Sequence, residues 1–66
     1  MTSVLRQIRE DQGLNQRELA EKSHIPQSLV SEIERGVRKP WPNAIRRISS
    51  ALGVSSELVF PKEDIK

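Results

Sequence analysis

Apolar positions recur at helical spacing along residues 16–35, QRELAEKSHIPQSLVSEIER. Leu19 and Ala20 give the first half of this stretch an apolar face, and Val30 and Ile33, three residues apart, give one to the second half. The opposite face of the second half is polar and carries Gln27, Ser28, Ser31, Glu32 and Arg35. The pattern predicts two short helices joined by a tight turn. The second of these helices presents hydrogen-bonding side chains outward, as a helix that enters a DNA major groove must.

Capping residues set the ends of the first two predicted helices. Thr2 or Ser3 can cap a helix over residues 3–12, whose apolar positions point inward, and Gly13 ends it with a left-handed backbone. Asn15, with Glu18 three residues later, has the capping-box spacing that starts a helix over residues 16–22. The turn that follows spans residues 23–25 and contains His24. We expect His24 to take the positive φ that such a turn requires, because His is among the residue types enriched there.

Prolines and glycines divide the rest of the chain. Pro26 precedes a predicted helix over residues 27–34, which Gly36 ends, and two prolines make residues 37–41 a loop. Pro42 begins a fourth helix that ends at Gly53. Ser55 can cap a last short helix with Leu58, Val59 and Phe60, which Pro61 closes. The expected fold is therefore all-α: one compact five-helix domain over residues 1–61, with a charged, frayed tail over residues 62–66.

Composition excludes several functions. The 66 residues include no cysteine and one histidine, so neither a disulfide framework nor a metal site is expected. Paired catalytic side chains and a glycine-rich phosphate loop are also missing, and we predict a protein that is not an enzyme and has no cofactor. No apolar run approaches the roughly 20 residues that cross a bilayer. The start of the chain lacks a signal peptide. We therefore expect no membrane partner and a cytoplasmic location, associated with the nucleoid when bound to DNA.

The distribution of charge is more informative than the net charge of +2. Residues 1–34 hold six acidic and four basic side chains. Residues 35–56 hold no acidic side chain and five basic ones: Arg35, Arg38, Lys39, Arg46 and Arg47. A block of one sign that begins where the outward-facing helix ends indicates a surface that contacts phosphates.

With these features together, the chain resembles the phage-repressor and Cro-like helix-turn-helix family. The resemblance extends over residues 4–61 and rests on LRQIREDQGLNQRELAEKS, on QSLVSEIERG, and on AIRRISSALGVS after the proline-containing loop. It implies a repressor-like DNA-binding fold with the motif at the second and third helices. It also implies a regulator that binds double-stranded DNA as a dimer on a palindrome, with repression as the expected mode.

The resemblance also implies roles for individual residues. Gln27 matches an adenine-reading glutamine, and the other base-reading candidates on the same helix are Ser28, Ser31 and Glu32. Leu29 lies at the margin of the outward face of this helix, where it either touches a thymine methyl or covers the edge of the core. The candidates for binding phosphates or bracing the reading helix are Gln16, Arg17, Arg35, Arg38, Lys39 and Asn43. Gln16 is expected to brace Gln27 with its side chain.

Arg9 and Glu34 match a structural pair rather than a DNA contact. In relatives these positions form a partly buried ion pair that joins the first helix to the end of the third. The sequence agrees, because Arg9 follows inward Ile8 and Glu34 follows inward Ile33. The alternative is that both charges are exposed to solvent.

Two residues depart from the family pattern. His24 stands where the family usually has Gly, and we interpret it as a tolerated left-handed residue. Trp41 replaces the usual Ser or Thr cap of the fourth helix, and we expect it to pack over the edge of the core rather than serve an interface. On the fourth helix, Ser49 and Ser50 are expected to face solvent.

A second class of function stays open beside DNA binding. The same fold can hold a protein partner, as in an antitoxin or an adaptor. Trp41 and the segment from Leu58 to Phe60 could form that surface, or they could simply close the core.

Overall fold

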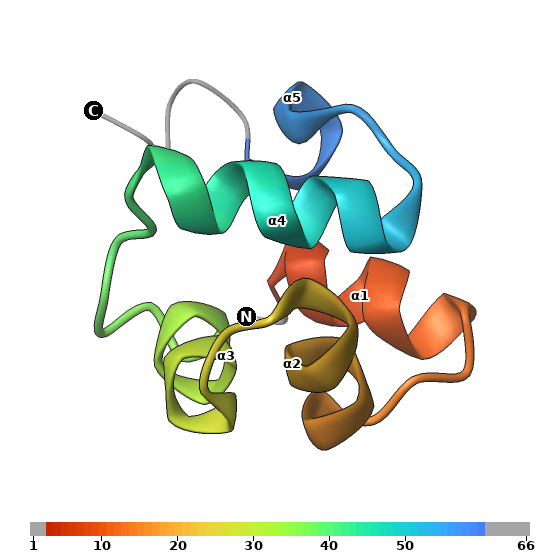
Figure 1. Ribbon diagram of the computed structural model, residues 1–66, viewed down its shortest axis with the longest axis horizontal. Coiled ribbons are helices and arrows are strands. Elements are labelled where there is room, and N and C mark those ends of the chain that lie inside the picture. The colour runs from red at the N-terminus through yellow and green to blue at the C-terminus, as the bar shows by residue number, and fades with distance from the viewer. Residues whose placement is uncertain (1–2, 61–66) are drawn as a thin grey trace.

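Five helices make up the part of the chain that is described, and residues 3–60 contain no strand (Figure 1). The structure is a computed structural model. Its helices are α1 Val4–Asp11, α2 Gln16–Ser23, α3 Gln27–Glu34, α4 Pro42–Leu52 and α5 Ser56–Val59. The predicted all-α, five-helix class is confirmed. The predicted end of the domain at residue 61 and the tail over residues 62–66 lie outside the described residues.

Local hydrogen bonds explain where the first two helices begin. Ser3 caps α1, because its side-chain oxygen accepts from the backbone N–H of Arg6 at 3.0 Å. Asn15 and Glu18 form the predicted capping box, each side chain accepting from the other residue's backbone N–H at 2.7 and 2.8 Å. Each bond satisfies one of the N–H groups that a helix start leaves without an intrahelical partner.

The turn between α2 and α3 differs slightly from its predicted limits. α2 extends one residue further, through Ser23, whose buried hydroxyl donates to the carbonyl oxygen of Leu19 at 2.7 Å. His24 then takes the left-handed conformation with φ 59°, as predicted, and among residues 3–60 it is the one non-glycine residue with positive φ. Pro26 is the N-cap of α3. The chain thus reverses direction between α2 and α3 within three residues.

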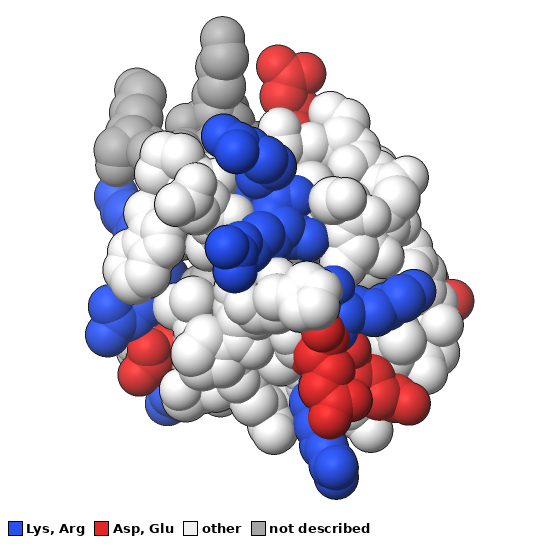
Figure 2. Space-filling view, viewed as in Figure 1, with Lys and Arg blue, Asp and Glu red and all other residues white. Residues whose placement is uncertain are grey.

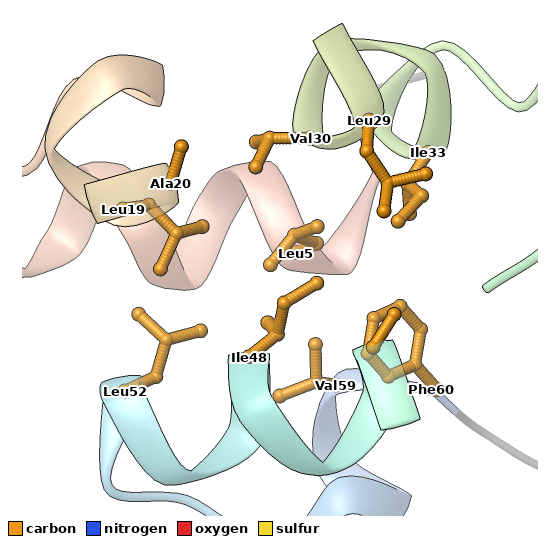
Figure 3. Packing of buried hydrophobic residues seen from close by; sticks show 11 residues of the cluster. Leu5, Leu19, Ala20, Leu29, Val30, Ile33, Ile48, Leu52, Val59 and Phe60 are labelled. Carbon is orange, nitrogen blue, oxygen red and sulfur yellow. The ribbon is translucent and has the colours of Figure 1, made fainter. Parts of the chain in front are cut away.

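The core lies between α1, α2 and α3 on one side and α4 and α5 on the other, as Figure 3 shows. Leu19 of α2, Val30 of α3 and Ile48 of α4 are fully buried. α2 packs against both α3 and α4, while α5 packs against α1 and α4. Leu29 is also buried, so it covers the core and is not placed at the groove margin. α3 is therefore fixed by packing along its whole inner face.

Ser49 contradicts the prediction that it faces solvent. It is 6 % exposed, and its hydroxyl oxygen has no hydrogen-bond partner within residues 3–60. The reason is its register, because Ser49 lies four residues after Ile45 and three before Leu52 and so shares their inward face. Ser50, one residue later, is exposed as predicted. None of the described helices has the length and apolar character needed to cross a membrane.

Candidate nucleic-acid interface

The four predicted base-reading residues lie on the outer side of α3. Gln27 and Ser28, in its first turn, are exposed, and Ser31 and Glu32 are partly exposed. The buried residues of this helix are Leu29, Val30 and Ile33, all on its inner side. α3 therefore presents a polar row that begins at its N-terminal end and lies away from the core.

The other side of α3 is attached to α1 by an ion pair. Arg9 Nε donates to Glu34 Oε2 at 2.7 Å, and Arg9 Nη2 donates to Glu34 Oε1 at 3.1 Å. The side chains are 8 % and 4 % exposed, so the predicted pair is formed and buried. The hydrogen bond to Glu34 raises the pKa of the Arg9 guanidinium, with the opposite charge adding to the effect and burial opposing it. Arg9 Nη1 also donates to the carbonyl oxygen of Leu14 at 2.7 Å.

Gln16 does not brace Gln27. Its side-chain amide donates instead to Glu34 Oε1 at 3.1 Å, so α2 is joined to the same carboxylate as α1. The charged, buried carboxylate of Glu34 is a stronger acceptor for the Gln16 amide than the neutral, exposed amide of Gln27 would be. A buried carboxylate oxygen with too few donors would also be unfavourable. Gln27 remains exposed. Glu34 thus accepts hydrogen bonds from side chains of two helices, α1 and α2.

A second ion pair lies on the outer side of α3. Arg38, in the loop after α3, donates through Nε to Glu32 Oε1 at 2.7 Å, with the two side chains 47 % and 33 % exposed. The guanidinium carbon of Arg38 lies 5.9 Å from the centroid of the Trp41 ring, within the range of a cation–π contact. One residue predicted to read a base and one predicted to bind a phosphate therefore contact each other.

Trp41 does not pack over the edge of the core as predicted. It is 51 % exposed and stands as the N-cap of α4 without making a side-chain cap bond. Leu29 and Ala44 line the same shallow depression as Trp41 and are already buried, so the core at this edge is closed without the indole. The guanidinium of Arg38 lies over the ring instead, and the indole stays half exposed.

The remaining residues predicted to bind phosphates are all exposed. Arg35 is the C-cap of α3, and Lys39 follows in the loop. Asn43 lies in the first turn of α4, whose first residue is Pro42 and has no N–H to offer. Arg17 is on α2, with Nε 3.5 Å from the carboxylate of Glu21 in a highly exposed pair. These residues come from three helices and one loop.

Two further hydrogen bonds from side chains to carbonyl oxygens, also not predicted, join parts of the chain that are far apart in the sequence. Arg47 Nη1 donates to the carbonyl oxygen of His24 at 2.9 Å and so joins α4 to the turn of the motif. Gln12 donates to the carbonyl oxygen of Leu52 at 2.7 Å, which joins the end of α1 to the end of α4. The only feature of the sequence that pointed to either bond was the basic block that contains Arg47. Nothing in the pattern indicates its acceptor, because the two residues are 23 positions apart.

Charge is unevenly distributed on the face drawn in Figure 2. Basic side chains gather over α4, where Arg46 and Arg47 are exposed, and acidic side chains gather over α2. α4 itself contains no acidic residue. This agrees with the one-sign block seen in the sequence.

A left-handed residue joins α2 to α3, and the polar outer face of α3 is carried on a five-helix core; this arrangement defines a helix-turn-helix domain. A family model described as helix-turn-helix matches residues 5–59. The chain belongs to that family, in its phage-repressor and Cro-like class, as the resemblance predicted.

Relatives in the same family have similar names. The chain is 36 % identical over 63 residues to the uncharacterized HTH-type transcriptional regulator Rv0474 of Mycobacterium tuberculosis, covering 96 % of this chain and 45 % of the relative. It is 38 % identical over 58 residues to the uncharacterized HTH-type transcriptional regulator y4dJ of Sinorhizobium fredii, covering 86 % and 75 %. The chain thus spans less than half of the mycobacterial relative. No solved structure matches the chain significantly.

Proposed function

We propose that this chain is a sequence-specific double-stranded DNA-binding domain of a transcriptional regulator, and that the regulator is a repressor. The observation that supports this best is the two-sided character of α3. Its inner side is buried and fixed through Glu34, whereas Gln27 and Ser28 are exposed at its N-terminal end. A helix presented in this way suits insertion into a major groove, where short polar side chains meet base edges.

Base reading is assigned to the outer row of α3. Gln27 can donate to N7 and accept from N6 of an adenine, and Ser28 can reach a neighbouring base edge. Ser31 and Glu32, about one turn further along, are the next residues in the row. Gln27 is exposed and has no side-chain bond to Gln16. The packing of α3 therefore positions Gln27 for the groove without that brace.

Phosphate binding is assigned to the ends of helices and to the loop after α3. The backbone N–H of Gln16 at the start of α2 and that of Asn43 at the start of α4 are placed at helix N-termini, which favour anions. The side chains assigned to the same role are Arg17, Arg35, Arg38 and Lys39. These contacts set the register of α3 in the groove without reading sequence.

Binding as a dimer completes the proposal. A single module of this size contacts a short half-site, and specific protein–DNA interfaces usually bury about 1,000–2,500 Å² of protein surface. Two copies on a palindrome, with half-sites about one DNA turn apart, reach that range. Sedimentation with a palindromic duplex should give two chains per duplex, and one chain per duplex would contradict it.

Selection from random double-stranded DNA tests the function. The wild-type chain should enrich a palindromic sequence. Gln27→Ala should then lose about 1–3 kcal/mol of discrimination between the selected duplex and a scrambled one. Lys39→Ala is the matched comparison, which should weaken binding to both duplexes alike and lower the salt slope by about one. Equal losses on both duplexes for Gln27→Ala would contradict the base-reading role.

A protein-binding function, as in an antitoxin or an adaptor, is the alternative. It is favoured by Leu58, which is 57 % exposed on α5 although its neighbours Val59 and Phe60 are buried. Leu58→Ser should then abolish capture of a partner in a pull-down without DNA and leave binding to the selected duplex unchanged. Loss of DNA binding alone would assign Leu58 to the dimer.

A further inference from the structure

Three side chains form a stack beside the outer face of α3: Glu32 on the helix, Arg38 in the loop and Trp41 at the start of α4. The carboxylate of Glu32 accepts from Arg38 Nε at 2.7 Å, and the guanidinium lies 5.9 Å from the centre of the indole. All three are partly exposed, at 33 %, 47 % and 51 %. Arg38 is therefore held from two directions at the boundary between the reading helix and the loop.

The charge of Glu32 needs a partner if α3 is to enter DNA. A carboxylate on that face approaches a dense row of phosphates, and like charges at such distances repel. Arg38 supplies the opposite charge at hydrogen-bond distance. One oxygen of the Glu32 carboxylate, Oε1, is thereby bonded to Arg38 and directed toward the loop.

Arg38 gains orientation from the same contacts. An exposed arginine samples many rotamers, and ordering it on binding lowers affinity. The bond to Glu32 uses one of the five N–H donors of the guanidinium and leaves the other four for acceptors outside the pair. A guanidinium ordered before binding is well suited to the paired oxygens of a phosphate.

We propose that Glu32 is a positioning residue: with Trp41 it holds the Arg38 guanidinium ready to bind a backbone phosphate at the edge of the major groove, and it does not read a base. The inference rests on the proposed DNA-binding function. It changes the role of Glu32 and gives Trp41 one.

A double-variant cycle tests it. Binding of wild type, Glu32→Ala, Arg38→Ala and the double variant is measured by fluorescence anisotropy across a sodium chloride series. The probes are the duplex selected by wild type and a scrambled duplex. Arg38→Ala should weaken binding to both by roughly 3- to 10-fold and lower the salt slope by about 0.9. Glu32→Ala should act in the same direction on both duplexes, and it should have no further effect once Arg38 is absent.

Conservative variants and a matched control complete the experiment. Glu32→Gln keeps an oxygen acceptor for Arg38, and Trp41→Phe keeps a ring, so both should bind as wild type, whereas Trp41→Ala should weaken binding. Arg6→Ala is the control, since Arg6 Nε makes the same kind of exposed contact to Glu10 at 3.1 Å on α1, away from the interface. It should leave affinity and salt slope within error of wild type.

Each other outcome overturns the proposal. A changed base preference at one position in Glu32→Ala, kept in the Arg38→Ala background, would make Glu32 a base reader. Tighter binding of Glu32→Ala to both duplexes would mean that Glu32 competes with DNA for Arg38. If wild type binds and Arg38→Ala behaves as Arg6→Ala does, only this inference fails. If selection with wild type enriches no duplex, the proposed function itself fails.

Discussion

The two ion pairs of α3 have the same length and different surroundings. Glu34 and Glu32 each accept from an arginine Nε at 2.7 Å, one from Arg9 and the other from Arg38. The side chains of the inner pair are 8 % and 4 % exposed, and those of the outer pair are 47 % and 33 % exposed. Residues that are two positions apart on an α-helix are separated by about 200° around its axis. The carboxylates of Glu32 and Glu34 therefore point to opposite sides of α3.

This difference in exposure decides what each pair does. A buried charge that loses its partner stays out of contact with water and without compensation. Removing one partner of the inner pair, Arg9 and Glu34, therefore strongly lowers the stability of the fold. Water and salt replace most of what an exposed pair provides, and such a pair adds little to stability. An exposed pair can therefore hold a side chain in position for another partner, such as a phosphate, with little effect on the stability of the fold.

The largest expected effect is on the inner pair. Glu34→Gln leaves the buried Arg9 with only the Glu10 carboxylate, 3.9 Å from its Nη2, as a counter-charge, and should reduce the free energy of unfolding by about 3–5 kcal/mol. Urea unfolding followed by circular dichroism measures it. An unchanged melting temperature would show that the pair is not structural.

A variant of both partners separates charge from volume. Arg9→Met with Glu34→Leu removes the pair and leaves no orphaned charge. It should recover much of the loss, because replacing a whole buried pair by apolar side chains is often neutral. Failure to recover would point to the other bonds of Arg9 and Glu34, those to Leu14 and Gln16.

Gln16 gives an intermediate effect on the same network. Gln16→Ala removes one amide donor from Glu34 Oε1 and keeps the ion pair. The expected loss of unfolding free energy is about 1.5–3 kcal/mol, the usual range for one hydrogen bond to a charged group. Thermal unfolding beside Arg17→Ala, whose ion pair is highly exposed, provides the comparison. A loss no larger than that of Arg17→Ala would mean that the bond adds nothing.

The outer pair should change stability little. Arg38→Ala should reduce the free energy of unfolding by no more than about 1 kcal/mol, because both partners are well hydrated. Urea unfolding in parallel with Glu34→Gln tests the contrast between the two pairs directly. A loss as large as that of Glu34→Gln would remove the distinction.

The smallest effect is expected at the turn, which belongs to neither pair. His24 has φ 59°, a conformation that Gly adopts without strain, so His24→Gly should be neutral or stabilising by less than about 1 kcal/mol. Its backbone carbonyl, which accepts from Arg47, is unaffected. His24→Val is the control and should destabilise, because β-branched residues tolerate positive φ poorly. A clear loss for His24→Gly would assign a role to the imidazole.

Much of the fold was predictable because it depends on local rules. Asn15 and Glu18 begin α2 through a capping box, and Gly53 ends α4 with a left-handed backbone. Such signals act over three or four residues and can be recognised in one dimension. Ser49 was mispredicted because residue type suggested solvent, while its register between Ile45 and Leu52 placed it inside.

The candidate site was predictable as a set of residues but not as a set of contacts. The polar row of α3 follows from helical periodicity, and the pairing of Arg9 with Glu34 follows from family resemblance. The bond from Gln16 to Glu34 and the stack of Trp41 on Arg38 did not follow from either. Both depend on how a loop or a neighbouring helix approaches α3.

The sequence by itself determined the helices, the ends of the first three to within one residue, the inward and outward faces of α3 and the left-handed turn at His24, because spacing and capping act along the chain. The tertiary structure alone decided which partner each outward or half-buried polar side chain takes. Arg38 could have faced solvent and Gln16 could have faced Gln27, since both arrangements satisfy the pattern. The approach of α1, α2 and the loop to α3 selects one acceptor for each donor, and that choice separates the residues that hold the fold from those left for DNA.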